Sequence, residues 1–356
     1  MQKIITAVLL LVFGILILTL LFEKGDFQAS KPSASIVDEA IDQGATFLKG
    51  ALAKGNFSMK CSLFDLLPCP VDRSGRSPLS FFIIDAIGEE LGREQTANVL
   101  SWLLSEKQDG LWGYSIDSPV DADDTAFALR VFKILNASIE FDSILEFYDS
   151  EAKGFKTFLI GNQSANLAFE PRASNSGQMH PEVNANAYLL FLDSPLGGYI
   201  NYNLTLASQD PEGYWYSYFY PSKYYSTYLN LELICSSNLT SAGLKDAQAR
   251  GVAFILKSQN GDGSWGDPGN AYETALALNA LASCSIFNGQ FEKGVQFLLK
   301  EQMPDDSWGT TKVIWEFHYE DDPPIVWRGY DESRIMTTSL VVKALKRAAG
   351  SGGLQG

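Results

Sequence analysis

The feature that most constrains this chain is a motif that returns at intervals of about one helical hairpin. Residues 209–215 and 259–265 share the pattern Gln-x3-Gly-x-Trp, residues 108–112 are a shortened copy, and residues 302–308 are a degenerate one. The last three tryptophans of these copies are 50 and 43 residues apart. Periods of this length indicate a repeated supersecondary unit.

The segments that follow these tryptophans resemble one another and are apolar on nearly every face. Residues 122–129 align with residues 271–278, and both are built from strong helix formers. A helix that is apolar all round is buried all round. The sequence therefore predicts six buried helices, near residues 78–92, 119–135, 181–192, 221–235, 270–284 and 332–347.

We expect a helix with one polar face before each buried helix, although two of these partners, near residues 141–158 and 196–208, are poorly defined. An open solenoid of such hairpins would need polar caps at its ends, and the sequence shows none. The predicted fold is therefore all-α, a single α/α toroid barrel of six hairpins. Its inner helices run in one direction, so their amino termini gather at one mouth, where we expect a pocket.

The amino-terminal run from Ile4 to Phe22 contains 19 uncharged residues, about the length that spans a bilayer. It is either a retained transmembrane helix, which its length favours, or a signal peptide cleaved near Ala29. Lys3 favours an inside amino end, which makes the protein a single-pass membrane protein with an extracytoplasmic domain. The expected organisation is an anchor over residues 1–23, a linker over 24–35, the toroid over 36–348 and a flexible tail over 349–356.

Charge and cysteine content limit the partners. The formal net charge of −15 argues against nucleic acid, which needs a basic surface, and makes any membrane attachment apolar. Asn-x-Ser/Thr triplets, which fit an exported domain, begin at Asn56, Asn136, Asn162, Asn203 and Asn238. The four cysteines, which allow two disulfides or free structural thiols and show no metal-ligand spacing, are Cys61, Cys69, Cys235 and Cys284.

Two motifs resemble those of a known family. The Gln-x3-Gly-x-Trp copies resemble the QW repeats of squalene–hopene and oxidosqualene cyclases. Residues 121–126, Asp-Ala-Asp-Asp-Thr-Ala, resemble the Asp-x-Asp-Asp-Thr-Ala motif of class II terpene cyclases. The resemblance covers roughly residues 40–347 and is to the monodomain type within the prenyltransferase α/α-toroid superfamily. QW repeats also occur in non-catalytic toroids, whereas the acidic motif is specific for activity.

This resemblance implies that Asp123 is a general acid that protonates a terminal alkene or epoxide, after which rings close through carbocations until a proton is lost. An alkene is a very poor base, so the acid must be neutral at the working pH and sheltered from water. Burial and the neighbouring carboxylates of Asp121 and Asp124 both favour the neutral form. Stabilisation of the carboxylate that remains after transfer is also required.

The other interpretation of the acidic triplet is that it caps a helix. The position of Asp123 is taken by Tyr225, Tyr272 and Met336 in the sister repeats, so the fold does not require a carboxylate there. The position of Asp124 is polar in every repeat compared, which leaves a structural role open for that residue.

Aromatic faces stabilise carbocations, and the loops and helix starts at the mouth supply several. Ordinary packing is the other explanation for such residues, and we expect only part of the set to line the cavity. The candidates are Trp112, Trp215, Tyr216, Tyr224, Tyr225, Tyr272, Trp315 and Trp327.

Class II cyclases usually orient the acid with a His or an Asn. The candidates for this role are His180, Asn184 and Asn186, at the start of one buried helix, and His318. None of them lies in a segment that matches a family motif, and Asn is also an ordinary helix cap.

The first functional hypothesis is therefore a class II-type cyclase of a lipid-soluble isoprenoid that works beside the membrane without a cofactor. Magnesium is expected only for a diphosphate substrate, and the charge of −15 favours a substrate without diphosphate. We expect no metal site, because Cys235 and Cys284 fall at the far ends of their helices. The alternative is a non-catalytic extracytoplasmic toroid that acts as a binding or interaction module.

Overall fold

The computed structural model describes residues 33–55, 59–63, 67–68, 76–116, 118–159, 178–238, 241–319 and 325–351. The described residues all belong to one compact unit, Ser33–Gly356. The expected anchor over residues 1–23, nearly all of the linker and residues 352–356 of the expected tail lie outside them. No helix in the described part of the chain is both long enough and apolar enough to span a bilayer.

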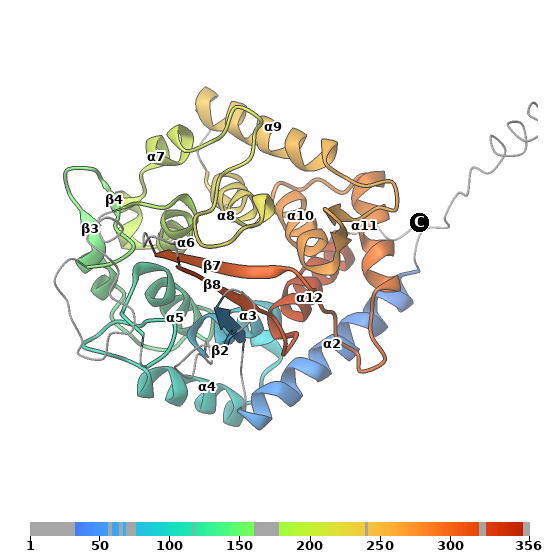
Figure 1. Ribbon diagram of the computed structural model, residues 1–356, viewed down its shortest axis with the longest axis horizontal. Coiled ribbons are helices and arrows are strands. Elements are labelled where there is room, and N and C mark those ends of the chain that lie inside the picture. The colour runs from blue at the N-terminus through green and yellow to red at the C-terminus, as the bar shows by residue number, and fades with distance from the viewer. Residues whose placement is uncertain are drawn as a thin grey trace, which may run out of the picture. The chain divides into compact units, whose positions relative to one another are not determined.

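Six inner helices form a closed ring (Figure 1). They are α3 (Arg76–Ile87), α5 (Ala122–Ile134), α6 (Pro181–Phe191), α8 (Lys223–Ser236), α10 (Ala271–Ser283) and α12 (Ile335–Gly350). Each inner helix packs against the next, and α12 packs against α3, which closes the ring. The prediction of six buried helices in an α/α toroid is confirmed.

Outer helices surround this ring: α2 (Ala34–Lys54), α4 (Arg93–Ser105), α7 (Tyr202–Ala207), α9 (Ala242–Lys257) and α11 (Gly289–Lys300). The two poorly defined partners are indeed reduced. Among the described residues between α5 and α6, the regular elements are the 3-10 helix η2 (Asp142–Phe147) and the hairpin of β3 (Tyr148–Asp149) and β4 (Gly154–Phe155). The short α7 follows η3 (Pro195–Tyr199), and a third 3-10 turn, η1 (Gly88–Glu90), ends α3.

The expectation of an all-α fold is wrong in one respect, because an antiparallel four-stranded sheet lies at the mouth. Its order is β2 (Leu67–Pro68), β1 (Lys60–Leu63), β8 (Ile325–Tyr330) and β7 (Val313–Tyr319). These strands come from the connections that enter α3 and α12, and Figure 1 shows β7 and β8 across the centre of the ring. Residues 315–319 do alternate between aromatic and polar side chains, the period of a strand.

The tryptophan of each repeat joins three helices. Trp265, in β5 (Trp265–Gly266), donates from Nε1 to the Ile255 carbonyl of α9 at 2.7 Å and from its backbone N–H to Thr274 Oγ1 of α10 at 3.0 Å. A Cβ on Gly294 of α11 would lie 2.6 Å from its ring. The other three repeat tryptophans make the same two kinds of hydrogen bond, and all four are fully buried.

The last repeat closes the ring onto the first helix. Trp308 donates from Nε1 to the Leu298 carbonyl of α11 at 2.6 Å and from its backbone N–H to Thr338 Oγ1 of α12 at 3.0 Å. A Cβ on Gly44 of α2 would lie 2.8 Å from its ring. The same contact that joins neighbouring hairpins therefore joins the sixth hairpin to the first.

In the two complete copies of the motif, the Gln and Gly hold the loop against the next outer helix. Gln259 Nε2 donates to the carbonyls of Gly263, at 2.9 Å, and of Gln290, at 2.7 Å. Gly263 has φ of 92°, and a Cβ there would lie 2.6 Å from the carbonyl oxygen of Lys293. The conformation and the close approach both require glycine.

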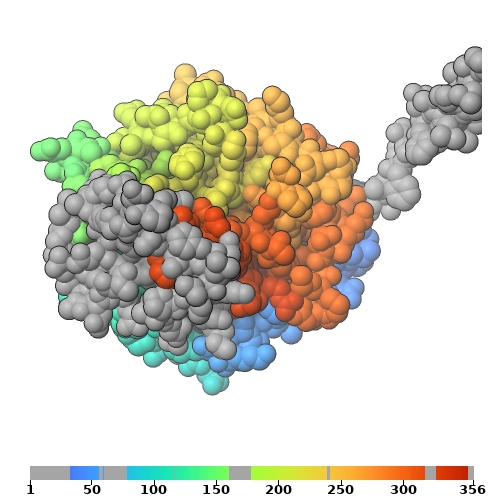
Figure 2. Space-filling view, viewed as in Figure 1, coloured from blue at the N-terminus to red at the C-terminus, as the bar shows by residue number. Residues whose placement is uncertain are grey.

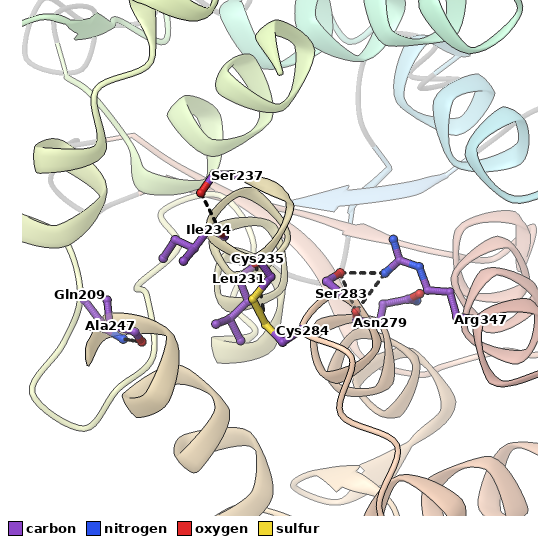
Figure 3. Close-up of a disulfide and its surroundings, with 10 residues drawn as sticks. All are labelled: Gln209, Leu231, Ile234, Cys235, Ser237, Ala247, Asn279, Ser283, Cys284 and Arg347. Carbon is purple, nitrogen blue, oxygen red and sulfur yellow. Dashed lines mark hydrogen bonds between the residues drawn. A yellow bond between two sulfur atoms is a disulfide. The ribbon is translucent and has the colours of Figure 1, made fainter. Parts of the chain in front are cut away.

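At the end of the barrel opposite the mouth, a disulfide joins Cys235 of α8 to Cys284 at the end of α10 (Figure 3). Arg347 of α12 donates beside it to the Asn279 carbonyl and to Ser283 Oγ, both at 2.9 Å. The carboxyl ends of three inner helices are thereby tied together. The side chain of Cys61 and all of Cys69 lie outside the described residues.

We expect Thr274→Val to destabilise the toroid by about 1–3 kcal/mol, because the buried N–H of Trp265 loses its acceptor. Denaturant unfolding of the full chain, read as the change in midpoint, measures this. The matched control is Thr46→Val, whose exposed hydroxyl donates only to the Asp42 carbonyl of its own helix. Its effect is expected to stay within about 0.5 kcal/mol, and equal losses in the two variants would contradict the role given to the Thr–Trp contact.

Candidate active site

The acidic triplet opens α5 at the mouth of the barrel, and its members have different roles. Asp121 is the N-cap of α5, and its Oδ1 accepts from the backbone N–H of Asp124 at 2.8 Å. Asp123, in the first turn, bonds instead to side chains from other elements. Helix capping therefore accounts for Asp121 and does not account for Asp123.

Asp123 has two side-chain partners. Asn186 of α6 donates from Nδ2 to Asp123 Oδ1 at 2.8 Å, and the Tyr220 hydroxyl, from the loop before α8, donates to Oδ2 at 3.3 Å. Asp123 is only 8% exposed, and Asn186 is fully buried. Of the four candidates for orienting the acid, the structure brings Asn186 to it, and Tyr220 joins the site without having been foreseen.

Arg130 fixes the orientation of the Asn186 amide. Its Nη1 donates to Asn186 Oδ1 at 2.6 Å. A guanidinium has no acceptor, so the amide oxygen must face Arg130 and the amide NH2 must face Asp123. Asp123 Oδ1 accepts the shorter bond, from the amide, which favours Oδ2, the oxygen on the side of Tyr220, as the position for the proton of the neutral acid.

Electrostatics keep this acid neutral. Burial raises the pKa of Asp123 well above its usual value, and the charges of Asp121 and Glu182 raise it further, against the hydrogen bonds from Asn186 and Tyr220. Burial also raises the pKa of Asp121 to about 6. Burial and these charges therefore favour the neutral form of Asp123, which is the form that an acid needs to protonate an alkene.

Asp124 is kept neutral in the same way. Burial, followed by the charge of Asp121, raises the pKa of Asp124 well above its usual value. Asp121 thus combines two roles, since its carboxylate caps α5 and its charge disfavours ionisation of both neighbours.

Glu182 of α6 is a site residue that the sequence analysis missed. It is fully buried, burial raises its pKa, and its Oε1 accepts from the backbone N–H groups of Tyr218 and Phe219 at 2.7 and 3.0 Å. These two bonds hold the loop that presents Tyr220 to Asp123. Glu182 therefore acts on the acid both through its charge and through this loop.

The sequence contains a pattern that could have identified Glu182 as a site residue, in a repeat where phenylalanine replaces the tryptophan. Phe155 is fully buried, and its backbone N–H donates to Asn184 Oδ1 at 2.8 Å, as each repeat tryptophan does to its threonine. Asn184 thus takes the structural place of threonine. This structural role explains the Asn184 side chain, and no contact with Asp123 is needed to explain it. With Asn184 aligned on the repeat threonines, Glu182 falls in register with Asp123.

His180 supports the same loop from the N-cap of α6. Its Nδ1 lies 2.7 Å from Thr157 Oγ1, its Nε2 lies 3.3 Å from Gln178 Oε1, and its ring stacks on Tyr218 with 4.3 Å between centroids. Burial lowers the pKa of His180 to about 4, so it is neutral at pH 7. None of these partners is Asp123. The side chain of His318 lies outside the described residues.

Tyr225 and Tyr272 lie at the mouth as expected, in the first turns of α8 and α10. Both are buried, and burial raises the pKa of both phenols well above the usual value, so they remain neutral. Tyr225 stacks on Tyr220 with 3.8 Å between ring centroids. The buried Tyr272 hydroxyl has no hydrogen-bond partner within the described part of the chain, which is typical of a group that faces a ligand cavity.

Three other aromatic candidates are not brought to Asp123. The indoles of Trp112 and Trp215 are enclosed between helices, where each Nε1 donates to an outer-helix carbonyl. Tyr224 packs on Phe254 of α9. These contacts agree with the other explanation that the sequence analysis left open for part of the set, which is ordinary packing. Tyr216 is 63% exposed.

Trp315 and Trp327 belong to the sheet at the mouth, whose β7–β8 region lies near the centre of the face in Figure 2. Trp315 donates from Nε1 to the Tyr114 hydroxyl at 3.3 Å, and Trp327 is 8% exposed. The neighbour of Trp315, Glu316, donates its backbone N–H to the Phe219 carbonyl at 2.7 Å. The sheet is thereby attached to the loop that carries Tyr220.

Solved structures of type II terpene cyclases have the same α/α toroid fold. The chain is similar to the type II terpene cyclase MstE from Scytonema in its apo form, with a TM-score of 0.72 and 18% identity over 89% of this chain and 99% of that one. MstE is also known in complex with its substrate, geranylgeranyl dihydroxybenzoate.

Two further structures share the fold. For the ent-copalyl diphosphate synthase from Streptomyces platensis the TM-score is 0.56, with 20% identity over 81% of this chain and 52% of that one. For the protein geranylgeranyltransferase-I of Candida albicans, complexed with GGPP, the TM-score is 0.52, with 10% identity over 86% and 90% of the two chains. At these identities the likeness is one of fold.

A curated ent-copalyl diphosphate synthase from a Streptomyces species is 29% identical to this chain over 169 residues. The match covers 46% of this chain and only 30% of that relative. No family model matches the sequence.

The raised pKa of Asp123 predicts that Asp123→Asn stabilises the fold at neutral pH. A carboxyl with a higher pKa when folded binds more protons in the folded state, so its contribution to stability falls as pH rises above about 4, the pKa of the unfolded chain. The Asn side chain does not ionise, so the variant does not lose this stability as pH rises. We expect it to exceed the wild type by about 1 kcal/mol or more at pH 7 and to converge with it near pH 4, as measured by denaturant midpoints.

Asp149→Asn is the comparison variant, for which the expected change in stability at pH 7 has the opposite sign. The pKa of Asp149 is lowered to about 2, first by Lys156 and then by the backbone N–H groups of Ala152 and Glu151. Its stabilisation is present above pH 4 and is lost as pH falls through about 2, so this variant should be less stable than the wild type at pH 7. If Asp123→Asn is also less stable than the wild type at pH 7, the raised pKa of Asp123 is contradicted.

Proposed function

We propose that this protein is a class II-type terpene cyclase in which Asp123 is the general acid. The observation that carries the proposal is a buried carboxyl whose pKa is raised well above its usual value and whose Oδ1 accepts from the Asn186 amide at 2.8 Å. In the same register, α8 and α10 carry tyrosine and α12 carries methionine, whereas α6 carries Glu182, whose Oε1 is bonded to backbone N–H groups. The shared fold of known type II cyclases supports the assignment.

The proposed reaction begins when the proton on Asp123 Oδ2 adds to the CH carbon of the terminal alkene, or to an epoxide oxygen whose C–O bond then opens, and either step leaves a tertiary carbocation. The π electrons of the next alkene attack this centre and close a ring. After the last closure a proton leaves the final cation and a double bond forms, so substrate and cyclic product are isomers. Asp123 recovers its proton from solvent.

Aromatic rings beside the acid suit the cationic stage. Tyr220 and Tyr225 form a stacked pair next to Asp123, and Tyr272 follows on the neighbouring helix. A cation that lies over such a face within a dry cavity is stabilised by roughly 2 kcal/mol. Their raised pKa values keep the phenols from ionising beside the cation.

We infer a polyprenyl substrate that carries no diphosphate. Basic side chains on the loops at the mouth are engaged with carboxylates: Lys223 with Glu212, Arg328 with Glu316, and Arg334 with Asp305. A diphosphate needs cations or Mg²⁺ to neutralise it. A prenylated arene of the kind that MstE binds fits the chemistry of this site, and no cofactor takes part in the proposed reaction.

The test incubates detergent-solubilised wild type and Asp123→Asn with squalene, oxidosqualene, geranylgeranyl diphosphate and a prenylated arene, and analyses the extracts by mass spectrometry. We expect an isomeric product from the wild type and a loss of at least about a thousandfold in the variant, because no other group supplies the proton at that site. Glu273→Gln is the matched control, a buried carboxyl in the first turn of α10, and should retain activity.

If neither protein forms a product although both are folded, the proposal fails. The toroid would then be a binding or interaction module, and Asp123 would be a helix-start residue without catalytic use.

We also propose that the domain lies on the extracytoplasmic side of a membrane, held by the amino-terminal helix expected over residues 1–23. The Cys235–Cys284 disulfide supports this, because disulfides persist in oxidising compartments. Asn136 and Asn203, which begin two of the glycosylation triplets, are exposed.

Acid quenching of whole cells, followed by alkylation and mass spectrometry, measures the state of this pair directly. We expect Cys235 and Cys284 to be bridged in more than about nine tenths of the molecules, because no reducing pool reaches an exported domain. Free thiols at both positions in quenched cells, with a bridge that appears only after lysis, would place the domain in the cytosol.

A further inference from the structure

Beneath the acid, the lumen of the barrel has a polar layer. Seven residues, or two helical turns, after Asp123 and its counterparts in α8, α10 and α12, the inner helices carry Arg130, Glu232, Asn279 and Lys343. We call Arg130, Glu232, Lys343, Asp85 and Arg347 the floor of the barrel. Arg130 and Glu232 are less than 10% exposed, and the Lys343 side chain is 11% exposed.

The floor is a connected set of charges. Lys343 Nζ lies 2.6 Å from Asp85 Oδ2 and 3.3 Å from Glu232 Oε1, and Arg347 also donates to Glu232. Against burial, the charges of Lys343, Arg347 and Arg130 lower the pKa of Glu232, so it is ionised. Three cations face two carboxylates, which leaves the floor with one positive charge in excess.

That excess lies on the side of the acid. Arg130 Nη1 donates to Asn186 Oδ1 at 2.6 Å, and Asn186 Nδ2 donates to Asp123 Oδ1 at 2.8 Å. Arg130 also lies over the Phe81 ring, 4.3 Å from its centroid, where it is shielded from water. One amide therefore connects the charged floor with the acid at the mouth.

We propose that Arg130 is the positioning residue of Asp123, an inference that rests on the proposed role of Asp123 as the acid. Arg130 fixes the amide of Asn186 and polarises it, so that its N–H is a stronger donor to the carboxylate formed when Asp123 gives up its proton. The excess charge of the floor then balances that carboxylate. Arg130 thus stabilises the product side of the proton transfer without touching the substrate.

The carboxyls at the mouth act in the opposite sense. Asp121 of α5 and Glu182 of α6 face Asp123 and disfavour its anion, and the phenols of Tyr220 and Tyr225 lie on the side of α8. A raised pKa alone would leave a weak acid. Arg130 compensates at the one oxygen that does not carry the proton.

The experiment compares Arg130→Met and Arg130→Lys with Lys133→Met as the matched control. Lys133 lies one turn further along α5 and also ties it to α6, by bonds to the Leu190 and Leu192 carbonyls, but has no link to Asp123. Infrared difference spectra of each protein with and without Asp123→Asn follow the protonated carboxyl of Asp123 against pH. This titration needs no substrate.

We expect the pKa of Asp123 to rise by about one unit or more in Arg130→Met and to change little in Lys133→Met. With a substrate that the wild type converts, kcat should fall about ten- to about a hundredfold in Arg130→Met while KM stays within about twofold. Arg130→Lys should restore part of both. A higher pKa together with a lower kcat distinguishes loss of carboxylate stabilisation from loss of the protonated form.

An Asp123 titration that is unchanged in Arg130→Met, or an equal loss in Lys133→Met, would overturn the proposal. If Arg130→Met does not fold, Arg130→Gln keeps a neutral donor to Asn186 and tests the charge alone, and an unchanged titration there overturns the charge balance. If the wild type converts no substrate, the proposed function fails, whereas the titration still decides whether Arg130 controls Asp123.

Discussion

The toroid depends on one contact, a buried tryptophan that bonds to one outer helix, bonds to the inner helix that follows and packs against a glycine of the next outer helix. Trp265 and Gly294 show it between neighbouring hairpins, and Trp308 and Gly44 show it at the closure. Each indole buries a large apolar surface while its N–H keeps a hydrogen-bond acceptor. Burial of the ring therefore leaves no polar group without a partner. Four of the six inner helices, α5, α8, α10 and α12, are held at the mouth by such a tryptophan, and Phe155 with Asn184 takes its place at α6.

Much of this was readable in the sequence because the contact repeats. The spacing of the tryptophans and the apolar helices after them predicted the ring, and the carboxylate at position 123, where sister helices carry tyrosine, marked the acid. Phe155 and Asn184 hid one repeat, because an aromatic ring and an amide replaced the tryptophan and the threonine. The sheet was missed because its strands lie in connections that a helical repeat leaves unspecified.

The partners of the acid were harder to foresee, because they come from separate elements. Tyr220 lies in a loop whose shape depends on Glu182, and Arg130 reaches Asp123 only through Asn186. Such contacts depend on the angles between helices and on side-chain rotamers, which no short pattern encodes. Asn184 and Asn186 are both sound candidates in sequence, and only the packing of α6 against α5 separates their roles.

The register shared by the inner helices has a consequence for how such proteins diversify. Asp123, Glu182, Tyr225, Tyr272 and Met336 occupy corresponding positions around one rim. A proton donor can occupy any of these positions without a change in the tryptophan contacts between the helices. A donor at another of these positions would start the cyclisation from a different side of the cavity. The folding of the substrate chain can therefore change while the stability of the toroid stays the same.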